Sequence, residues 1–268
     1  MPVAAARGRG VETEGPVTAP PRPARAEAPA VDEAIVRAEG ILLAAAAGGF
    51  AEARHEMVFP RWAGFHGAVE RQSSDVFARA VIAGVLLDVA ELQGGEAADR
   101  WLAIAGREAE HVAAARLDDR PGGWSYFPGL PELPPDLDSL AAAALLFARA
   151  APQLLPLCEE PFRWALDSAA ADGSVKTWIV APSSSPSQLR AMRRGIRWYW
   201  GDGADVEVCA RFFRALHRVA PQRHAAAVNK GTLWGVAQQR SSGTWGATWY
   251  WGEVCGAAWD AAGCGRAG

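Results

Sequence analysis

Residues 230–252 read KGTLWGVAQQRSSGTWGATWYWG, and this stretch decides the fold that we expect for the chain. A helical segment here ends in a Gly-x-Trp turn, and seven of the chain's twelve tryptophans lie between Trp198 and Trp259. Two similar turns occur earlier, at Trp124 and at Trp178, and each of the three turns is bounded by predicted helices. Repeated helix pairs stack side by side, either in a solenoid or closed into a ring. The sequence therefore predicts an all-α domain built from stacked helix pairs.

Apolar residues recur at helical spacing through most of the chain, whereas no segment shows a comparably clear strand pattern. We predict helices over residues 31–47, 76–92, 97–117, 140–149, 160–171, 186–200, 205–219 and 221–239. Residues 1–30 are rich in Ala, Pro, Arg and Glu and have no apolar segment, which is typical of a disordered leader rather than a secretory signal. The expected organisation is a leader over 1–30 and one helical domain over 31–268.

The 268 residues carry a formal charge of −3, which gives no electrostatic case for binding nucleic acid or an anionic membrane. The four cysteines show neither metal-ligand spacing nor the density of a disulfide scaffold, so we expect a reduced, cytoplasmic protein. The longest apolar run, residues 140–148, has nine residues, whereas a membrane-spanning helix needs about 20. No transmembrane segment is expected, and contact of an exposed apolar helix with a membrane surface stays open.

A second informative stretch, residues 122–140, reads GGWSYFPGLPELPPDLDSL. Its prolines keep the connector extended, because proline fixes φ and disfavours helix in the residue before it. Asp136, Asp138 and Ser139 then stand where a helix rich in Ala and Leu begins, and all three are good N-cap residues. Helix capping alone is one interpretation. The other is an acid site, in which the helix N-terminus stabilises the carboxylate that remains after a proton is donated.

These residues resemble the segment of squalene–hopene cyclases and other class II terpene cyclases that carries an Asp-x-Asp-Asp acid motif. The shared features are Gly-Gly-Trp, an aromatic pair and then Pro-Asp-x-Asp-Ser. In that family the middle Asp protonates an alkene or an epoxide, and Asp138 matches it. Asp136 matches the first Asp, while Ser139 stands in place of the last. The resemblance implies that Asp138 is the general acid, that Asp136 shares its proton, and that Ser139 donates to the carboxylate left behind.

The stretch at 230–245 resembles the QW repeat of triterpene cyclases through Lys230-Gly231, Trp234, Gln238 and Gly243-x-Trp245. The repeat is expected to be structural: a Gln side chain can bond the free N–H groups of a neighbouring helix start while the Trp stacks against it. The resemblance covers roughly residues 77–256. It implies the (α/α) toroid shared by terpene cyclases and protein prenyltransferase β-subunits, here full or partial. Because these cyclases place the acid between two such barrels, a second barrel in trans is an implied partner.

The resemblance also implies an aromatic pocket that stabilises carbocations through the quadrupoles of its rings. The candidate substrate-binding residues are Trp124, Tyr126, Trp245, Trp249 and Tyr250. Neither a metal nor a cofactor is implied for this chemistry. Hopene cyclases also have a His that bonds the catalytic acid, and Cys209 occupies that place here; a thiol is a weak hydrogen-bond donor and cannot orient the acid as an imidazole would.

Three functions stay open. The first is a class II terpene cyclase-like enzyme, an isomerase or lyase acting on a linear polyprene such as squalene or a prenyl diphosphate. The second is a noncatalytic (α/α) barrel that binds a lipid or a partner subunit, because fold does not fix function. The third is a prenyltransferase on the same barrel. That chemistry resembles zinc–thiolate activation and needs an Asp-x-Cys pair, whereas Asp205 and Cys209 are four residues apart.

Overall fold

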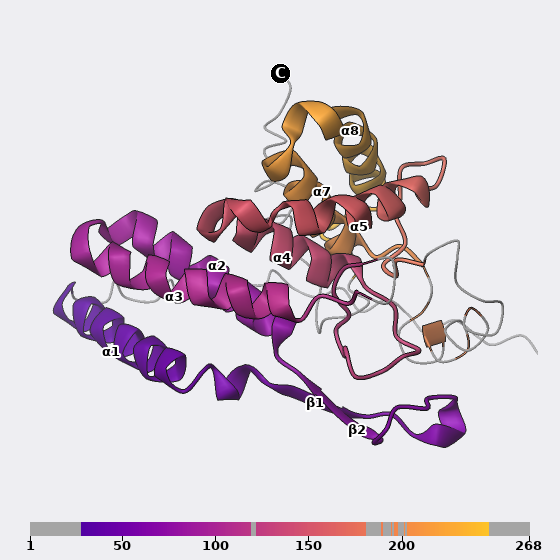
Figure 1. Ribbon diagram of the computed structural model, residues 1–268. Coiled ribbons are helices and arrows are strands. Elements are labelled where there is room, and N and C mark those ends of the chain that lie inside the picture. The colour runs from indigo at the N-terminus through magenta and orange to yellow at the C-terminus, as the bar shows by residue number, and fades with distance from the viewer. Residues whose placement is uncertain are drawn as a thin grey trace, which may run out of the picture. The chain divides into compact units, whose positions relative to one another are not determined.

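The computed structural model describes residues 28–118, 122–180 and 203–246, together with Leu189, Arg194, Ile196, Arg197 and Gly201. Over these residues the chain is mostly helical (Figure 1), which confirms a predominantly α fold. The chain divides into a unit that ends at Ala44 and a unit that begins at Ala45. Most of the expected leader and most of the basic helix expected over 186–200 lie outside the described residues.

The N-terminal helix α1 runs over Ala28–Ala47 and agrees with the helix predicted over 31–47. It ends in a tight turn in which Phe50 adopts a left-handed conformation, with φ of 53°. The Phe50 side chain is buried, and its N–H donates to the Ala45 carbonyl at 2.7 Å. A 3-10 helix, η1 (Ala51–Ala53), follows.

A short antiparallel hairpin comes next, and its two strands are β1 (His55–Val58) and β2 (Arg71–Ser74). The expectation that this region holds no strand was wrong. The reason lies in β2, whose buried side chains are the polar Gln72 and Ser74. A four-residue strand with a polar inward face has no apolar alternation by which the sequence could reveal it. The connection contains a second 3-10 helix, η2 (Arg61–Ala63).

Three helix pairs make up most of the remaining described chain (Figure 1). They are α2 (Val76–Gln93) with α3 (Gly95–Ala114), α4 (Leu137–Ala150) with α5 (Pro156–Asp167), and α7 (Val206–Val219) with α8 (Pro221–Ala237). A 3-10 helix, η3 (Pro152–Leu154), joins α4 to α5. The first helices of the pairs contact one another in chain order, α2 with α4 and α4 with α7. The helix pairs are thus joined to one another through their first helices.

The three first helices run in the same direction, as contacts between their matching ends show. Arg211, early in α7, lies 3.1 Å from Asp138 in the first turn of α4. Arg149, in the last turn of α4, lies 2.8 Å from Glu91 near the end of α2. An Asp also precedes each of these helices, at positions 75, 136 and 205. The site described below therefore lies where three helix N-termini meet.

The turn that follows each pair is repeated in its backbone hydrogen bonds. The bonds are Leu117 N–H to Gly123 O, Ala170 N–H to Ser174 O and Arg240 N–H to Thr244 O, at 2.9, 2.9 and 2.8 Å. The next residue in each turn is buried: Trp124, Val175 and Trp245. Val175 thus takes the position of Trp in the middle repeat. Trp178, which the sequence aligned with the other two, lies three residues further along and donates to the Gly201 carbonyl at 3.2 Å.

Helix α4 forms the centre of the core. Its residues from Leu140 to Ala144 are all buried, as are Leu146 and Phe147. It contacts α2, α3, α5 and α7, and a helix covered on so many sides is apolar nearly all round. The long apolar run in the sequence therefore reflects burial within the protein. None of the described helices is long and apolar enough to cross a membrane.

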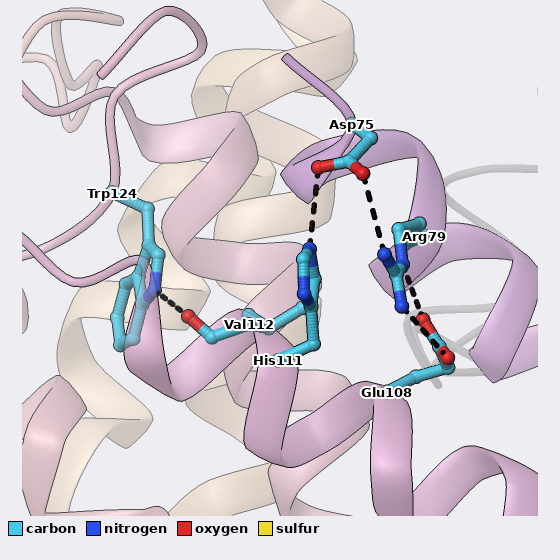
Figure 2. Close-up of polar contacts among 6 residues, drawn as sticks. All are labelled: Asp75, Arg79, Glu108, His111, Val112 and Trp124. Atoms are coloured by element: carbon cyan, nitrogen blue, oxygen red, sulfur yellow. Dashed lines mark hydrogen bonds and ion pairs between the residues drawn. The ribbon is translucent and has the colours of Figure 1, made fainter. Parts of the chain in front are cut away.

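Polar contacts join α2 to α3 within the first pair (Figure 2). The Arg79 guanidinium donates to both carboxylate oxygens of Glu108, at 2.5 and 3.0 Å, and to Asp75 at 3.3 Å. Asp75 also lies 3.2 Å from Nε2 of His111. Burial raises the pKa of Asp75, but hydrogen bonds and charges from His111 and Arg79 outweigh it and lower the pKa overall. This network holds the start of α2 against the last turns of α3.

Candidate functional site

Asp136 is fixed in place by backbone bonds on both sides. Its N–H donates to the Trp124 carbonyl at 2.9 Å, and the next N–H, of Leu137, donates to the Thr177 carbonyl at 2.8 Å. Asp136 has an extended backbone and is the N-cap of α4. The Asp136 side chain accepts a hydrogen bond from the free N–H of Ser139 in the first turn. For this reason α4 begins at Leu137, three residues before the expected start at Leu140.

The Asp136 carboxylate is buried, with 3% of the residue exposed, and it accepts three hydrogen bonds. The donors are the Ser139 N–H at 2.7 Å, the Ser139 hydroxyl at 3.0 Å and the Tyr126 N–H at 2.9 Å. Burial and the Asp138 charge together raise the pKa of Asp136 to about 7, although the three hydrogen bonds oppose this rise. Ser139, which was expected to support the carboxylate of Asp138, donates to Asp136 instead.

Asp138 lies one residue inside the helix and faces α7. One of its carboxylate oxygens is 3.1 Å from an Arg211 guanidinium nitrogen, and only 13% of the Asp138 side chain is exposed. The guanidinium carbon of Arg211 also lies 5.1 Å from the centre of the Phe77 ring, in the first turn of α2. Arg211, in the second turn of α7, therefore links that helix to the first turns of α2 and α4.

Besides Asp136, Asp138 and Asp205, the site contains a further acidic residue, Glu207, which the sequence did not lead us to predict. Asp205 caps α7 by accepting from the N–H groups of Glu207 and Val208 at 3.0 and 3.3 Å. Glu207 is thus the second residue of α7, as Asp138 is the second residue of α4. The pattern Asp-x-Asp at residues 136–138 recurs as Asp-x-Glu at residues 205–207, near the start of another predicted helix. This recurrence could have revealed Glu207.

The electrostatic setting of Glu207 favours a bound proton. Burial and the negative charges of Asp205 and Asp138 together raise the pKa of Glu207 to about 7, although the Arg211 cation opposes them. Its Oε2 atom is buried and has no hydrogen-bond partner among the described residues. A carboxyl group that holds a proton near neutral pH can act as a general acid.

Tyr126 borders the same cluster from the connector before α4. Its hydroxyl lies 3.0 Å from Nδ1 of His55, and its ring centre lies 5.8 Å from that of Phe77. Burial raises the pKa of Tyr126, and the charges of Asp136 and Asp138 add to this. Of the three predicted aromatic residues that the structure describes, Tyr126 is thus the one whose ring lies beside the acids.

The other predicted aromatic residues have different surroundings. Trp124 is fully buried, contacts Phe147 and donates through Nε1 to the Val112 carbonyl at 2.6 Å (Figure 2). Trp245 is also buried and donates in the same way to the Gly235 carbonyl at 2.7 Å. These contacts account for both tryptophans structurally, and their role in ligand binding stays a prediction. The remaining two candidates, Trp249 and Tyr250, lie outside the described residues.

Two further sequence expectations concern Gln238 and Cys209. Gln238 is exposed, and over the described ranges its side chain makes no hydrogen bond to a helix start; the side-chain bond in this turn runs from Gln239 to the Gly243 carbonyl at 2.8 Å. The Cys209 thiol donates to the Val175 carbonyl at 3.2 Å and is buried. Burial raises the pKa of Cys209 to about 12. Cys209 therefore behaves as a core residue and does not orient the acids.

A groove of about 600 Å³ runs along the faces of α2, α4 and α7. Its apolar lining includes Val81, Val85 and Leu145, and its basic lining comes mainly from α7. Arg211 belongs both to this lining and to the acid cluster, whereas Asp138 and Glu207 themselves do not line the groove. A volume of this size is within the range of small-molecule sites. The described residues hold no group of three or more His, Cys, Asp or Glu that could bind a metal ion.

Comparisons with known proteins add little to this description. No protein-family model matches the chain, and no curated protein matches it. A crystal structure of a protein from Actinoplanes is similar, with a TM-score of 0.48 and 20% sequence identity. The similarity covers 75% of this chain and 51% of that one, so the chain spans about half the length of that protein.

Proposed function

We propose that this protein is a class II terpene cyclase-like enzyme that protonates a linear polyprene in the groove along α2, α4 and α7. The observation that carries the proposal is the pair Asp138 and Glu207, which occupy equivalent positions at the starts of neighbouring helices, near a groove whose lining includes apolar residues of α2 and α4. Proton-initiated cyclisation needs an acid that is protonated at working pH and a pocket that keeps water from the cation. Glu207 meets the first requirement, and the apolar residues in the groove lining provide part of the second.

We assign the proton to Glu207 rather than to Asp138. Asp138 lies against the Arg211 cation, and an opposite charge at this distance favours the ionised carboxylate. The ionised Asp138 then raises the pKa of Glu207, which has one buried oxygen without a partner among the described residues. The resemblance to the family motif places the acid at Asp138, so the two assignments give different predictions for the same pair of variants.

The proposed reaction is an isomerisation, in which the cyclic product has the same atoms as the linear substrate. Glu207 transfers its proton to one carbon of a terminal alkene, the π electrons form the new C–H bond, and a carbocation remains on the other carbon. The π electrons of the next alkene attack this cation and form the ring bond. A carbon next to the final cation then gives a proton to water, which restores an alkene, and the Glu207 carboxylate takes a proton back from water, so that the acid is regenerated and no proton is gained or lost. Phe77 and Tyr126 present aromatic rings beside the acids, where they can stabilise cationic intermediates.

The proposed architecture is an arc of an (α/α) toroid. Three stacked helix pairs with parallel first helices support this, since that layer would form the inner wall of a toroid. In the related cyclases the acid lies between two barrels. A second barrel, supplied by another chain, would therefore cover the acid cluster and exclude water from it.

A noncatalytic barrel is the second candidate, and the Asp138–Arg211 ion pair favours it. This pair neutralises the residue that matches the family's acid and ties α4 to α7. A lipid-binding or partner-binding protein would keep such a contact for stability alone. The third function, prenyl transfer, gains no support from Cys209, because a zinc-bound thiolate must ionise and this buried thiol has a pKa of about 12.

The test is turnover of defined polyprenes by the purified full chain. Squalene, farnesyl diphosphate and geranylgeranyl diphosphate are incubated separately, treated with phosphatase where needed, and analysed by gas chromatography with mass spectrometry. A cyclic product of the same mass as its linear substrate, absent with Glu207→Gln, supports the proposal. Absence of product from all three substrates favours the noncatalytic barrel.

A further inference from the structure

The lining of the groove repeats along α2, α4 and α7, because the same positions after each N-cap Asp face it. These positions lie six, nine and thirteen residues after Asp75, Asp136 and Asp205, and the three helices run in the same direction. Equivalent residues therefore lie at about the same height along the groove. The three sets are Val81, Ala142 and Arg211; Gly84, Leu145 and Arg214; and Asp88, Arg149 and Arg218.

The two walls of the groove carry opposite charges. On the α2 side, Asp88 and Glu91 share the single guanidinium of Arg149, and their side chains are 65% and 71% exposed. Two carboxylates against one cation leave a net negative charge on this wall. On the α7 side, Arg214 and Arg218 are exposed, and neither forms an ion pair with a carboxylate of the described residues. The α7 wall is therefore positive.

Apolar side chains accompany these charges. Val81 and Val85 of α2 are 39% and 49% exposed, and Leu145 of α4 lines the groove with them. An exposed apolar surface bordered by charged residues is typical of a protein–protein contact. Complementary charges at such a contact determine which partner binds and in which orientation. The partner of this face must therefore offer a positive surface to α2 and a negative surface to α7.

We propose that this face binds the same face of a second copy of the chain, with α2 of one copy against α7 of the other. A twofold contact needs a surface that is complementary to itself. Rotation about a twofold axis parallel to the helices keeps the height of each residue and exchanges the two walls. Asp88 and Glu91 of each copy then meet Arg218 and Arg214 of the other. A twofold axis across the helices would instead place α2 against α2 and α7 against α7, where like charges repel.

The dimer encloses the groove, because two concave faces that meet at their α2 and α7 walls leave the apolar lining inside. This inference goes beyond the proposed function and does not require catalysis. It is also separate from the second barrel proposed above, which covers the helix starts. The face is about 20 Å long, the length of α7, and three helices spaced by 8–10 Å give it an area of about 500–600 Å². Standard interfaces bury about 800 Å² per partner, so we expect a reversible dimer with a Kd in the micromolar range.

Sedimentation equilibrium of the full chain, from about 1 to 200 μM, measures the dimer Kd and tests the proposal. Arg218→Glu and Asp88→Lys each place like charges opposite one another twice in a dimer, so each should raise the Kd at least about tenfold. An equimolar mixture of the two variants should dimerise like the wild type, because one wall pair is then unchanged and the other has both charges reversed. The matched control is Arg223→Glu on α8, outside the groove lining, which should leave the Kd unchanged. Melting curves check that each variant stays folded.

Three results would overturn the proposal. A chain that stays monomeric over this range leaves the groove to a different partner. A Kd that neither groove variant changes places the contact elsewhere on the surface, and a loss that mixing does not restore excludes the pairing of α2 with α7. Dimerisation is measured without substrate, so it fails or succeeds independently of catalysis. A charge-dependent dimer without any cyclic product keeps this inference and removes the cyclase, whereas turnover by a monomer does the reverse.

Discussion

Arg211 of α7 lies 3.1 Å from Asp138 of α4, and this ion pair joins the starts of two helices that belong to different repeats. The same Arg211 opposes the raised pKa of Glu207, whereas Asp138 increases it. Asp138 and Arg211 therefore act on Glu207 with opposite signs. This opposition gives the acid site a test that does not depend on loss of activity alone.

Activity is expected to fall as pH rises above about 7, because Glu207 must be protonated to donate. Asp138→Asn removes a negative neighbour, lowers the pKa of Glu207 and moves this limb of the pH–rate profile to lower pH. Arg211→Gln removes a positive neighbour and moves the limb to higher pH. Profiles of kcat/KM for a prenyl diphosphate substrate check both shifts. Complete loss of activity at every pH in Asp138→Asn, with Glu207→Gln still active, would return the acid role to Asp138.

Glu207→Gln is expected to lower kcat by at least about 10²-fold, the scale of general-acid catalysis, while the protein stays folded. The same variant should be more stable than the wild type at pH 8. The pKa of Glu207 in the folded state, about 7, is raised above that of an unfolded glutamate, about 4.3. Its contribution to stability is therefore complete below about pH 4.3 and is lost as pH rises through 7. Urea unfolding of both proteins at pH 4 and pH 8 measures this, and equal differences at the two pH values would contradict the raised pKa.

Asp136→Ala is expected to reduce the free energy of unfolding by about 2 kcal/mol, because it removes an N-cap and leaves the donors of Ser139 and Tyr126 without their acceptor. Asp136→Asn keeps one acceptor oxygen and should cost less. Chemical denaturation at pH 7 provides the measurement. The control Asp167→Ala changes an exposed aspartate at the end of α5 and should shift stability by less than about 0.5 kcal/mol. A loss in Asp136→Ala no larger than in this control would contradict the capping role.

Trp245→Ala is expected to cost about 3–5 kcal/mol, the usual effect of truncating a buried tryptophan. Trp245→Phe keeps much of the packing and loses only the bond to the Gly235 carbonyl, so about 1–2 kcal/mol should be lost. Thermal melts followed by circular dichroism check the order of the two variants. Trp62→Ala is a suitable comparison, because Trp62 is 80% exposed and should tolerate truncation. An unchanged melting temperature for Trp245→Ala would remove the structural role of this repeat.

Much of the helical architecture could be predicted from the sequence. The predicted helices 76–92, 205–219 and 221–239 correspond to α2, α7 and α8 with small shifts at their ends. Apolar spacing and capping residues act within a few neighbours along the chain, so a single sequence reveals them. The hairpin was not predicted because β2 turns polar side chains inward. The equivalence of Val175 to Trp124 and Trp245 was not predicted because the three turns share a backbone hydrogen bond and not a residue type.

For the candidate site too, some features could be predicted from the sequence and others could not. The sequence by itself determined that Asp136 and Asp138 open a helix, because prolines end the preceding connector and a short polar side chain caps the free N–H groups of the next residues. Only the tertiary structure decided which charges meet. Packing of α7 on α4 brings Arg211 to Asp138 and places Glu207 where burial and neighbouring carboxylates raise its pKa. These outcomes depend on contacts between residues far apart in the chain, and local sequence patterns carry no information about such contacts.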